Sequence, residues 1–421
     1  MRWDKKIRAG ALQFVLFIGA IIAVLLIMFV LISHTQNLFN KKTALTVDLI
    51  QAADYAIDYS LANDFVVGKN IEIPYQEGSP ISLEIRKDFW GIFEKITSTS
   101  KQNSIEFSKS ALVGGNWSEM SALYLKDKQR PLIVAGKTKI TGDAYLPQQG
   151  IRMGNISGNS YSHQQLLYGT KRNSQDELPK LKSSVLNQII QLTNNSFGEV
   201  KEEIRLKRNL ELRNSFQSPT IFIREGTVHL EMVALSGNIV ISATDRIIVE
   251  PSAQLRDVLL IAPEILIKDS VQGYFQAFAN KNIHVGKNCN LGYPTALVVR
   301  NPAQSNKKNS DQKPKLAIDA HSEIKGALIY LENIKDQSYV PSIKIGENVI
   351  VQGEIYCEKN LELKGSVYGN VTTDGFIAME NGSIYQNHIY NGIIDGSSLV
   401  PGYAGLLYET APSKKVMKWL Y

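Results

Sequence analysis

One stretch near the C-terminus decides the fold: residues 343–371 read IKIGENVIVQGEIYCEKNLELKGSVYGNV. An apolar residue recurs at every sixth position of this stretch without slippage, and a second apolar row follows two places behind the first. Residues two apart in a β-strand point to the same side, so each six-residue repeat can form one short strand with two inward side chains. The first row is Ile343, Val349, Ile355, Leu361 and Val367, and the second is Ile345, Val351, Cys357 and Leu363.

Three earlier motifs have the same shape, namely RIIV at 246–249, EILI at 264–267 and NIHV at 282–285. Their first apolar residues, Ile247, Ile265 and Ile283, are eighteen apart each time. Three six-residue sides make one coil of eighteen, so the spacing predicts a three-sided β-helix, or β-solenoid, in which each coil stacks on the next. A β-sandwich is the alternative, but its strands recur about every 8 to 12 residues. We therefore predict a mainly β protein and expect the outward residues Lys344 and Glu362 to be exposed.

The N-terminus carries a run of 22 residues, 11–32, in which Gln13 is the only clearly polar side chain. A helix of that length spans about 33 Å, enough for a hydrocarbon core of about 30 Å. The preceding flank is basic, which by the positive-inside rule predicts a cytoplasmic N-terminus. We expect a single-pass protein of the cell inner membrane, anchored through residues 11–32, with its bulk periplasmic or extracellular. The charged residues of the flank are Arg2, Lys5, Lys6 and Arg8 against Asp4.

Apolar residues at four-residue spacing on residues 37–63 predict that the helix continues beyond the span as an amphipathic stalk. A helix-like piece is expected at 89–96, and one or two amphipathic helices at 180–213, with Val185 and Ile204 on their apolar faces. We divide the chain into a leader and transmembrane helix (1–33), a stalk helix (34–64), a mixed α/β linker region (65–131), first solenoid strands (132–154), a loop and helical insertion (155–218), β-solenoid (219–300), a polar loop (301–316), β-solenoid (317–395) and a C-terminal cap (396–421).

The segment KIRAGAL at 6–12, with the long apolar helix behind it, resembles the start of minor type IV pilins and type II secretion pseudopilins, in particular the large PilX-like and GspK-like members. The resemblance implies cleavage by prepilin peptidase between Gly10 and Ala11, and partners among pilin or secretion-system subunits. That family usually carries Glu at the fifth mature position, which is Val15 here. The largest tip-located pseudopilins also lack this Glu. An uncleaved signal anchor stays open as the alternative.

A second resemblance, to bactofilins and other polymer-forming β-helix proteins, rests on residues 343–371, with weaker support from 239–291. It implies the fold only. Bactofilins are small and have no long helical insertion, so self-polymerisation is not carried over.

The common catalytic motifs are absent, including Walker-type loops, zinc-ligand spacings, HExxH and GxSxG. His284 could be a catalytic residue like that of the hexapeptide acyltransferases, or an ordinary surface histidine. Asp257, Glu264 and Asp269 could line a groove, as in polysaccharide lyases built on β-helices, or be solvated charges. We predict no catalytic, cofactor-binding or metal-ligating residues and no cofactor. The late aromatic residues could form a sugar-binding strip or cap the last coil: Tyr356, Tyr368, Phe376, Tyr385, Tyr390, Tyr403 and Tyr408.

The two cysteines, Cys289 and Cys357, are too few for a disulfide framework or a zinc site. They could pair in an external compartment or lie buried as free thiols. Basic residues are scattered and the net charge of +6 is mild for 421 residues, so we expect no nucleic-acid partner. The sequence thus predicts a non-enzymatic, membrane-anchored structural component, pilin-like or an envelope assembly protein, that presents a β-solenoid. The alternatives are a glycan- or protein-binding surface module and a β-helix enzyme acting on polysaccharide.

Overall fold

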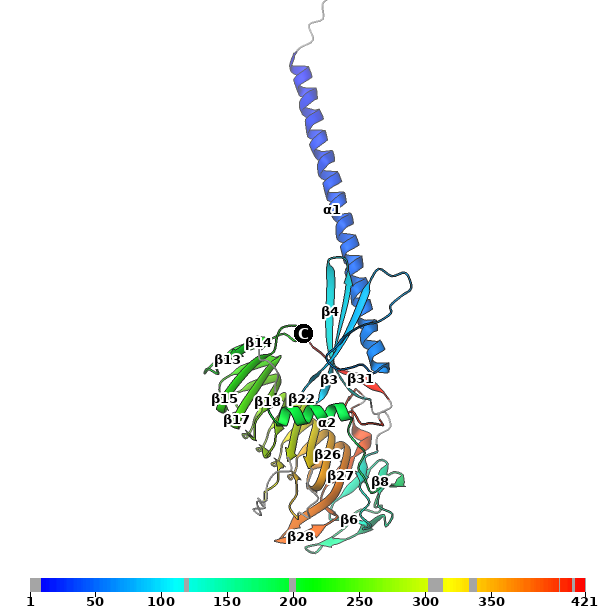
Figure 1. Cartoon of the computed structure of the whole chain (residues 1–421), viewed down its shortest axis with the longest axis vertical. Helices are drawn as coiled ribbons and strands as arrows, with labels where there is room; N and C mark the ends of the chain where they lie inside the picture. The colour runs from blue at the N-terminus through cyan, green and yellow to red at the C-terminus, as the bar shows by residue number, and fades with distance from the viewer. Residues whose placement is uncertain are drawn as a thin grey trace, which may run out of the picture. The chain divides into compact units, whose positions relative to one another are not determined.

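The structure is a computed structural model that describes residues 9–116, 121–196, 202–301, 313–332, 339–400, 402–410 and 413–420. The described chain is mainly β, with one long N-terminal helix and a large parallel sheet (Figure 1). It divides into two compact units. The first holds residues 1–58, 70–85 and 98–109, and the second holds 59–69, 86–97 and 110–421.

In the first unit the long helix α1 (Ala9–Ala62) has two different halves. The side chains from Leu12 to Ile32 are exposed, whereas Leu49, Ala53 and Ile57 are fully buried. The buried part packs on strands of the same unit, where the Ser100 hydroxyl donates a hydrogen bond to the Leu49 carbonyl oxygen at 2.8 Å. The predicted continuation of the helix through residues 37–63 is confirmed up to Ala62.

The strands that follow α1 form a sheet of order β1-β2-β3-β4-β31. The helix expected at 89–96 is wrong, because this segment holds the end of β2, a two-residue turn at 91–92 and the start of β3. Buried and exposed side chains alternate along β2, the two-residue period of a strand. The members are β1 (Asn70–Glu72), β2 (Ser82–Trp90), β3 (Phe93–Gln102), β4 (Ile105–Gly115) and β31 (Lys414–Leu420).

In the second unit most strands pair in parallel with the strand about one repeat further along the chain, and we call this array the parallel stack. The predicted spacing of eighteen is confirmed, because Ile247 is in register with Ile265 and Ile265 with Ile283. Ile343 is likewise in register with Leu361.

The parallel stack begins with β13 (Glu202–Ile204), β14 (Glu211–Asn214), β15 (Ile221–Leu230), β16 (Ala234–Gly237), β17 (Ile239–Val249), β18 (Gln254–Ile261), β19 (Glu264–Ile267), β20 (Gln272–Ala279), β21 (Asn282–Val285) and β22 (Asn290–Asn301). It continues with β23 (Leu316–Ile318), β24 (Glu323–Glu332), β25 (Ile343–Ile345), β26 (Ile350–Leu363), β27 (Ser366–Glu380) and β30 (Ile393–Asp395). Its last strands, in spatial order, come from an earlier part of the chain: β5 (Leu123–Leu125), β7 (Lys139–Thr141), β8 (Ala144–Leu146) and β12 (Lys171–Asn173).

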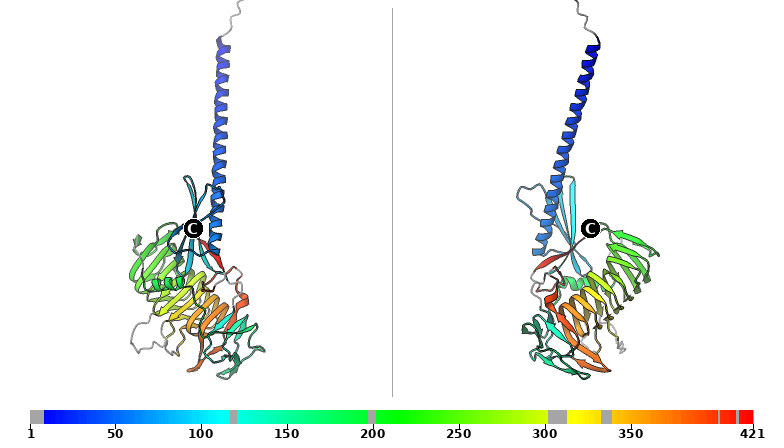
Figure 2. Two further views of the ribbon diagram at one scale, coloured as in Figure 1. Left: turned by 45° about the vertical axis from the view of Figure 1, so that its right-hand side comes forward. Right: turned by 180° about the vertical axis from the view of Figure 1, so that it is seen from behind.

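The position of residues 132–154 differs from the expected order, in which they were the first solenoid strands, and residues 123–125 and 171–173 also contribute strands beside them. Leu123 pairs with Val371, and Lys139 pairs with Ile393. These strands therefore extend the parallel stack beyond β27 and β30, as the teal strands beside the orange ones show (Figure 2). Two small sheets lie in the same region. They contain β6 (Leu132–Ala135), β9 (Ile151–Met153), β29 (His388–Tyr390), β10 (Asn155–Ile156) and β11 (Asn159–Ser160).

The inward side chains of the parallel stack form one large apolar core. All five members of the six-residue row are fully buried, and Lys344, one place along, is exposed as predicted. The expectation for Glu362 is wrong, since this side chain is only 2% exposed. The antiparallel pair of β27 and β28 (Ser383–Gln386) lies near the Glu362 side chain. The ammonium of Lys364, two residues further along the chain, donates a hydrogen bond to a carboxylate oxygen of Glu380 on β27 at 3.0 Å. The core residues of the row are Ile343, Val349, Ile355, Leu361 and Val367.

The helix α2 (Ser183–Thr193) covers outward apolar residues of β20 and β22, as Figure 1 shows. Val185, Ile189 and Leu192 are the buried apolar residues of this helix. The described part of 180–213 holds no second helix, because 202–204 and 211–214 are strands paired in parallel with β15 and β16. Backbone hydrogen bonds to a neighbouring strand outweigh a weak helical preference here. Val200 lies outside the described residues. A short 3₁₀ turn, Gly396–Ser398, follows β30.

Candidate functional site

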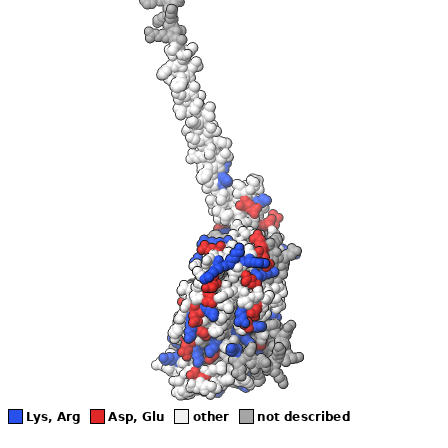
Figure 3. All heavy atoms as spheres, turned by 90° about the vertical axis from the view of Figure 1, so that its left-hand side faces the viewer, with Lys and Arg blue, Asp and Glu red and all other residues white. Residues whose placement is uncertain are grey.

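The predicted cleavage position lies at the start of the described helix. Gly10 and Ala11 are both helical and exposed, while the basic flank at 1–8 lies outside the described residues. Within the described chain, α1 is one helix that is long and apolar enough to cross a membrane. Figure 3 shows no charged side chain on its upper part.

The candidate catalytic residues do not come together. His284 is exposed and its Nε2 lies 2.9 Å from a carboxylate oxygen of Asp319, so it forms a surface pair. Asp257 is bound by Lys418 at 2.6 Å, and Glu264 lies 3.9 Å from Arg246. The described residues contain no group of His, Cys, Asp or Glu side chains that could hold a metal ion.

The two cysteines and several of the late aromatic residues are buried in the core. Cys289 and Cys357 are buried and free, and burial raises the pKa of the Cys357 thiol to about 12, so it is an inert apolar group. Several late aromatic residues are buried and form no surface strip: Tyr356, Phe376, Tyr390 and Tyr408.

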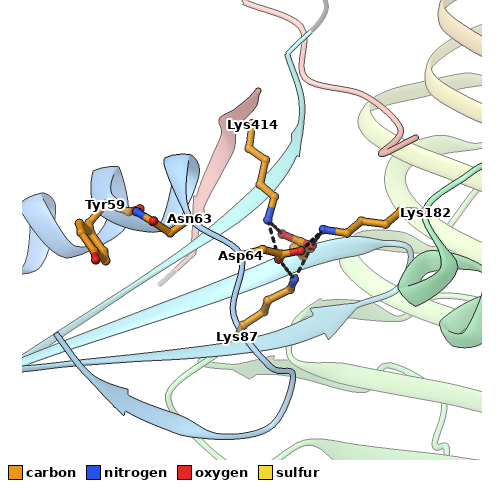
Figure 4. Close-up of polar contacts among 7 residues, drawn as sticks. Tyr59, Asn63, Asp64, Lys87, Lys182 and Lys414 are labelled. Atoms are coloured by element: carbon orange, nitrogen blue, oxygen red, sulfur yellow. Dashed lines mark hydrogen bonds and ion pairs between the residues drawn. The ribbon is translucent and has the colours of Figure 1, made fainter. Parts of the chain in front are cut away.

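The structure instead assembles a cluster of charges that the sequence does not mark, the lysine–carboxylate cluster of Asp64, Lys87, Glu94, Lys182 and Lys414 (Figure 4). Glu94 is 0% exposed and Lys87 is 2% exposed. The Lys87 ammonium lies 2.6 Å from an oxygen of Asp64 and 2.8 Å from one of Glu94. Lys414 lies 2.8 Å from the other oxygen of Glu94, and Lys182 lies 2.5 Å from Asp64.

The cluster keeps Asp64 and Lys87 charged. Burial alone would raise the pKa of Asp64, but hydrogen bonds from Lys182 and Lys87 and the charge of Lys414 outweigh it and lower the pKa well below its usual range. Burial would lower the pKa of Lys87, but the hydrogen bond to Asp64 and the charge of Glu94 reverse this and raise it. A protonated lysine is no nucleophile and an ionised aspartate is no acid, so this geometry favours a structural role over catalysis.

The cluster connects five separate parts of the second unit. Asp64 follows the end of α1 by two residues, Lys87 lies on β2, Glu94 on β3, Lys182 just before α2, and Lys414 at the start of β31. Residues 64 and 414 are 350 positions apart, and no local pattern in the sequence could have predicted that they meet. The site therefore connects the chain immediately after α1 to β31, the last strand.

A second buried acid, Glu354 on β26, binds the backbone of the C-terminal segment at residues 404–406. It is 0% exposed, and its Oε2 accepts a hydrogen bond from the Leu406 backbone N–H at 3.0 Å. Tyr293 binds the same segment, since its hydroxyl donates to the Ala404 carbonyl at 2.8 Å. Burial raises the pKa of Glu354 to about 8, although the bond from Leu406 opposes the shift. Glu354 is therefore protonated in the folded protein at neutral pH.

This raised pKa predicts a specific dependence of stability on pH. The unfolded chain releases the Glu354 proton near pH 4.5 and the folded chain near pH 8, so the free energy of unfolding falls as pH rises through this window. Replacing Glu354 with Gln should leave stability at pH 4.5 almost unchanged and increase it at pH 9 by a few kcal/mol. Chemical denaturation of the detergent-solubilised protein at both pH values measures this difference.

The matched control is Glu347→Gln, which alters an exposed carboxylate. Glu347 lies four residues before Val351, the first buried residue of β26. The free energy of unfolding of Glu347→Gln should equal that of the unaltered protein at both pH values. An equal gain at pH 4.5 and pH 9 for Glu354→Gln would contradict the proton linkage and indicate a packing effect.

Comparison of the chain with protein-family models, with curated proteins and with solved structures finds no match. The function is therefore argued from the residues and their geometry.

Proposed function

We propose that this protein is a non-enzymatic structural component that is anchored in the cell inner membrane, is pilin-like, and presents a three-sided β-solenoid outside the cytoplasm. One observation carries the proposal. The helix α1 runs without a break from an exposed apolar half into a half that packs on strands of its own unit. That division is the one expected of a pilin-like N-terminus, in which one half of the helix lies in lipid and the other half is part of the folded domain.

The solenoid part of the proposal is supported by the registers of the parallel stack. Parallel partners eighteen residues apart are what one full coil of three six-residue sides requires. The coil length is not constant, because Ile355 is in register with Val371, sixteen residues away. This coil is two residues shorter than a coil of eighteen. Because side chains alternate with a period of two along a strand, the same side chains still point inward.

The lysine–carboxylate cluster supports a mechanical role. Glu94 and Lys87 are both buried, and such ion pairs are costly to break, since each partner left alone would be a buried unpaired charge. The cluster holds Asp64, which follows α1, against β2, β3 and β31 and the segment before α2, and such cross-linking of distant parts of the second unit is consistent with a structural role.

Orientation and processing are tested together on one protein. Alkaline phosphatase fused after residue 421 should be active, because the enzyme folds only outside the cytoplasm, while the same reporter fused before Met1 should be inactive. N-terminal sequencing of the membrane-extracted protein should start at Ala11. Activity of the N-terminal fusion alone would overturn the orientation, and an intact Met1 would remove the pilin-like processing and leave a plain membrane anchor.

A second function, as a binding module, is favoured by one observation. Residues 121–182 contain ten Lys and Arg against four Asp and Glu, an excess of six basic residues in one segment.

A further inference from the structure

The segment 121–182 has a clear excess of basic over acidic residues. Residues 121–182 contain ten Lys and Arg against four Asp and Glu, a net charge of +6. The whole chain has 46 basic and 40 acidic residues, so the remaining 36 and 36 balance. Figure 3 shows basic and acidic side chains interspersed over another face of the protein. A local excess of one sign attracts partners of the opposite sign.

Part of this excess is neutralised by nearby acids. Lys126 and Lys128 contact Asp374, Lys180 contacts Glu177, Arg172 contacts Asp143, and Lys182 belongs to the lysine–carboxylate cluster. What remains exposed, with no ion pair among the described residues, includes Lys137, Arg152 and Lys171.

These three side chains surround the last strands of the parallel stack. Arg152 is on β9, next to Ile151, and Lys171 begins β12. The Lys171 ammonium lies close to Gly150, two residues before Arg152, since a Cβ added at Gly150 would be 2.8 Å from it. Lys137 lies at the turn between β6 and β7, where its carbonyl oxygen is 3.3 Å from the ring Nε2 of His163. The three cations thus lie on or next to the last strands of the parallel stack.

The rest of this end is made of neutral hydrogen-bonding groups. Between residues 128 and 175 no Asp or Glu is fully exposed, whereas many amide and hydroxyl side chains are. Such groups pair with sugar hydroxyls, because each can donate and accept a hydrogen bond. The exposed members are Gln148, Gln149, Asn155, Ser157, Asn159, Ser160, Ser162, Gln164, Gln165 and Asn173.

The aromatic residues argue against nucleic acid. Tyr124 and Tyr145 stack on each other with ring centroids 5.4 Å apart and are only partly exposed. Single-stranded nucleic acid is bound by exposed aromatic rings on which bases stack. Here the rings are already paired, and Arg172 lies over Tyr145 at 5.8 Å.

We propose that the end of the parallel stack formed by residues 121–182 binds an acidic polysaccharide. Lys137, Arg152 and Lys171 pair with carboxylates of the polymer, and the surrounding Asn, Gln and Ser side chains bond its hydroxyl groups. The proposal concerns the binding function and does not depend on the pilin-like anchor, so the two can fail separately.

The test uses the full chain in detergent and fluorescent polygalacturonate, a polymer with one carboxylate per sugar. The unaltered protein should bind it, with affinity that falls as salt rises. The variant Lys137→Glu/Arg152→Glu/Lys171→Glu should lose about ten-fold or more in affinity, because three attractions become repulsions. Methyl-esterified polygalacturonate, which has the same sugars without charge, should bind at least about ten-fold more weakly.

The matched control is Arg256→Glu/Lys268→Glu/Lys287→Glu, which reverses one exposed arginine and two exposed lysines elsewhere in the parallel stack. It should keep affinity within about two-fold, although the net charge changes by the same amount. Equal losses in both variants would overturn the proposal in favour of net charge alone. Tighter binding of single-stranded DNA than of polygalacturonate, at equal charge and salt, would overturn it in favour of nucleic acid. The absence of polygalacturonate binding at low salt would overturn it outright.

Discussion

Replacing Ile355 with Lys should abolish folding of the parallel stack. Ile355 is 0% exposed and lies in the large apolar core, in register with Leu328 and Val371. A lysine there has no carboxylate partner on the inward side, and burying it costs several kcal/mol, which is a large part of the stability of a typical domain. Limited proteolysis of the membrane-extracted variant should therefore degrade residues 202–395, which should be resistant in the unaltered protein.

The control for this change is Gln352→Lys on the same strand. Gln352 points outward, is only partly buried, and its side chain donates to Glu323 at 3.0 Å, so a lysine there meets an acid at the surface. The free energy of unfolding should change by less than about 1 kcal/mol. Equal protease resistance of the two variants would contradict the inward register of β26.

Replacing Glu94 with Gln should destabilise the second unit by about 3 to 5 kcal/mol, because the buried Lys87 and the largely buried Lys414 lose a charged partner. Chemical denaturation of the solubilised protein, followed by tryptophan fluorescence, measures the change. Trp90, which lies on β2 and is buried, places a reporter near the altered residue.

The double variant Glu94→Leu/Lys87→Met distinguishes two effects, the loss of an ion pair and the cost of leaving a charge buried without its partner. It removes both buried charges and leaves Asp64 with Lys182 and Lys414. Buried ion pairs replaced by apolar residues of similar size are often no less stable, so much of the loss should be recovered. A double variant as unstable as Glu94→Gln would show that packing around Glu94, and not its charge, sets the stability.

The sequence predicts the inward rows well, because their residues obey a local rule. Ile247, Ile265 and Ile283 reveal their register through spacing alone, and the structure confirms it. Glu362 has the same outward position as Lys344 but is buried, since β27 continues into an antiparallel pair that the repeat does not encode. Spacing predicts which way a side chain points and says nothing of what covers it.

The lysine–carboxylate cluster and the position of residues 121–173 could not be predicted for a related reason. Both depend on contacts between distant parts of the chain, such as Leu123 with Val371 and Asp64 with Lys414. A single charged residue looks the same in sequence whether it ends in solvent or in a buried cluster. The long apolar helix is the opposite case, because the length and composition of α1 follow from a local stretch of sequence.

The strand order has a consequence for how the protein is made. β5 and β7 leave the ribosome more than 240 positions before β27 and β30, the strands with which they pair. Before those partners are synthesised, β5 can pair with β8 and β8 with β12, but the edge of β5 that faces β27 and the edge of β7 that faces β30 stay unpaired. Closing so long a loop is slow, and an unpaired strand invites association with other chains. The nascent protein therefore passes through a stage with unpaired strand edges, and that stage ends only when β27 and β30 have been synthesised.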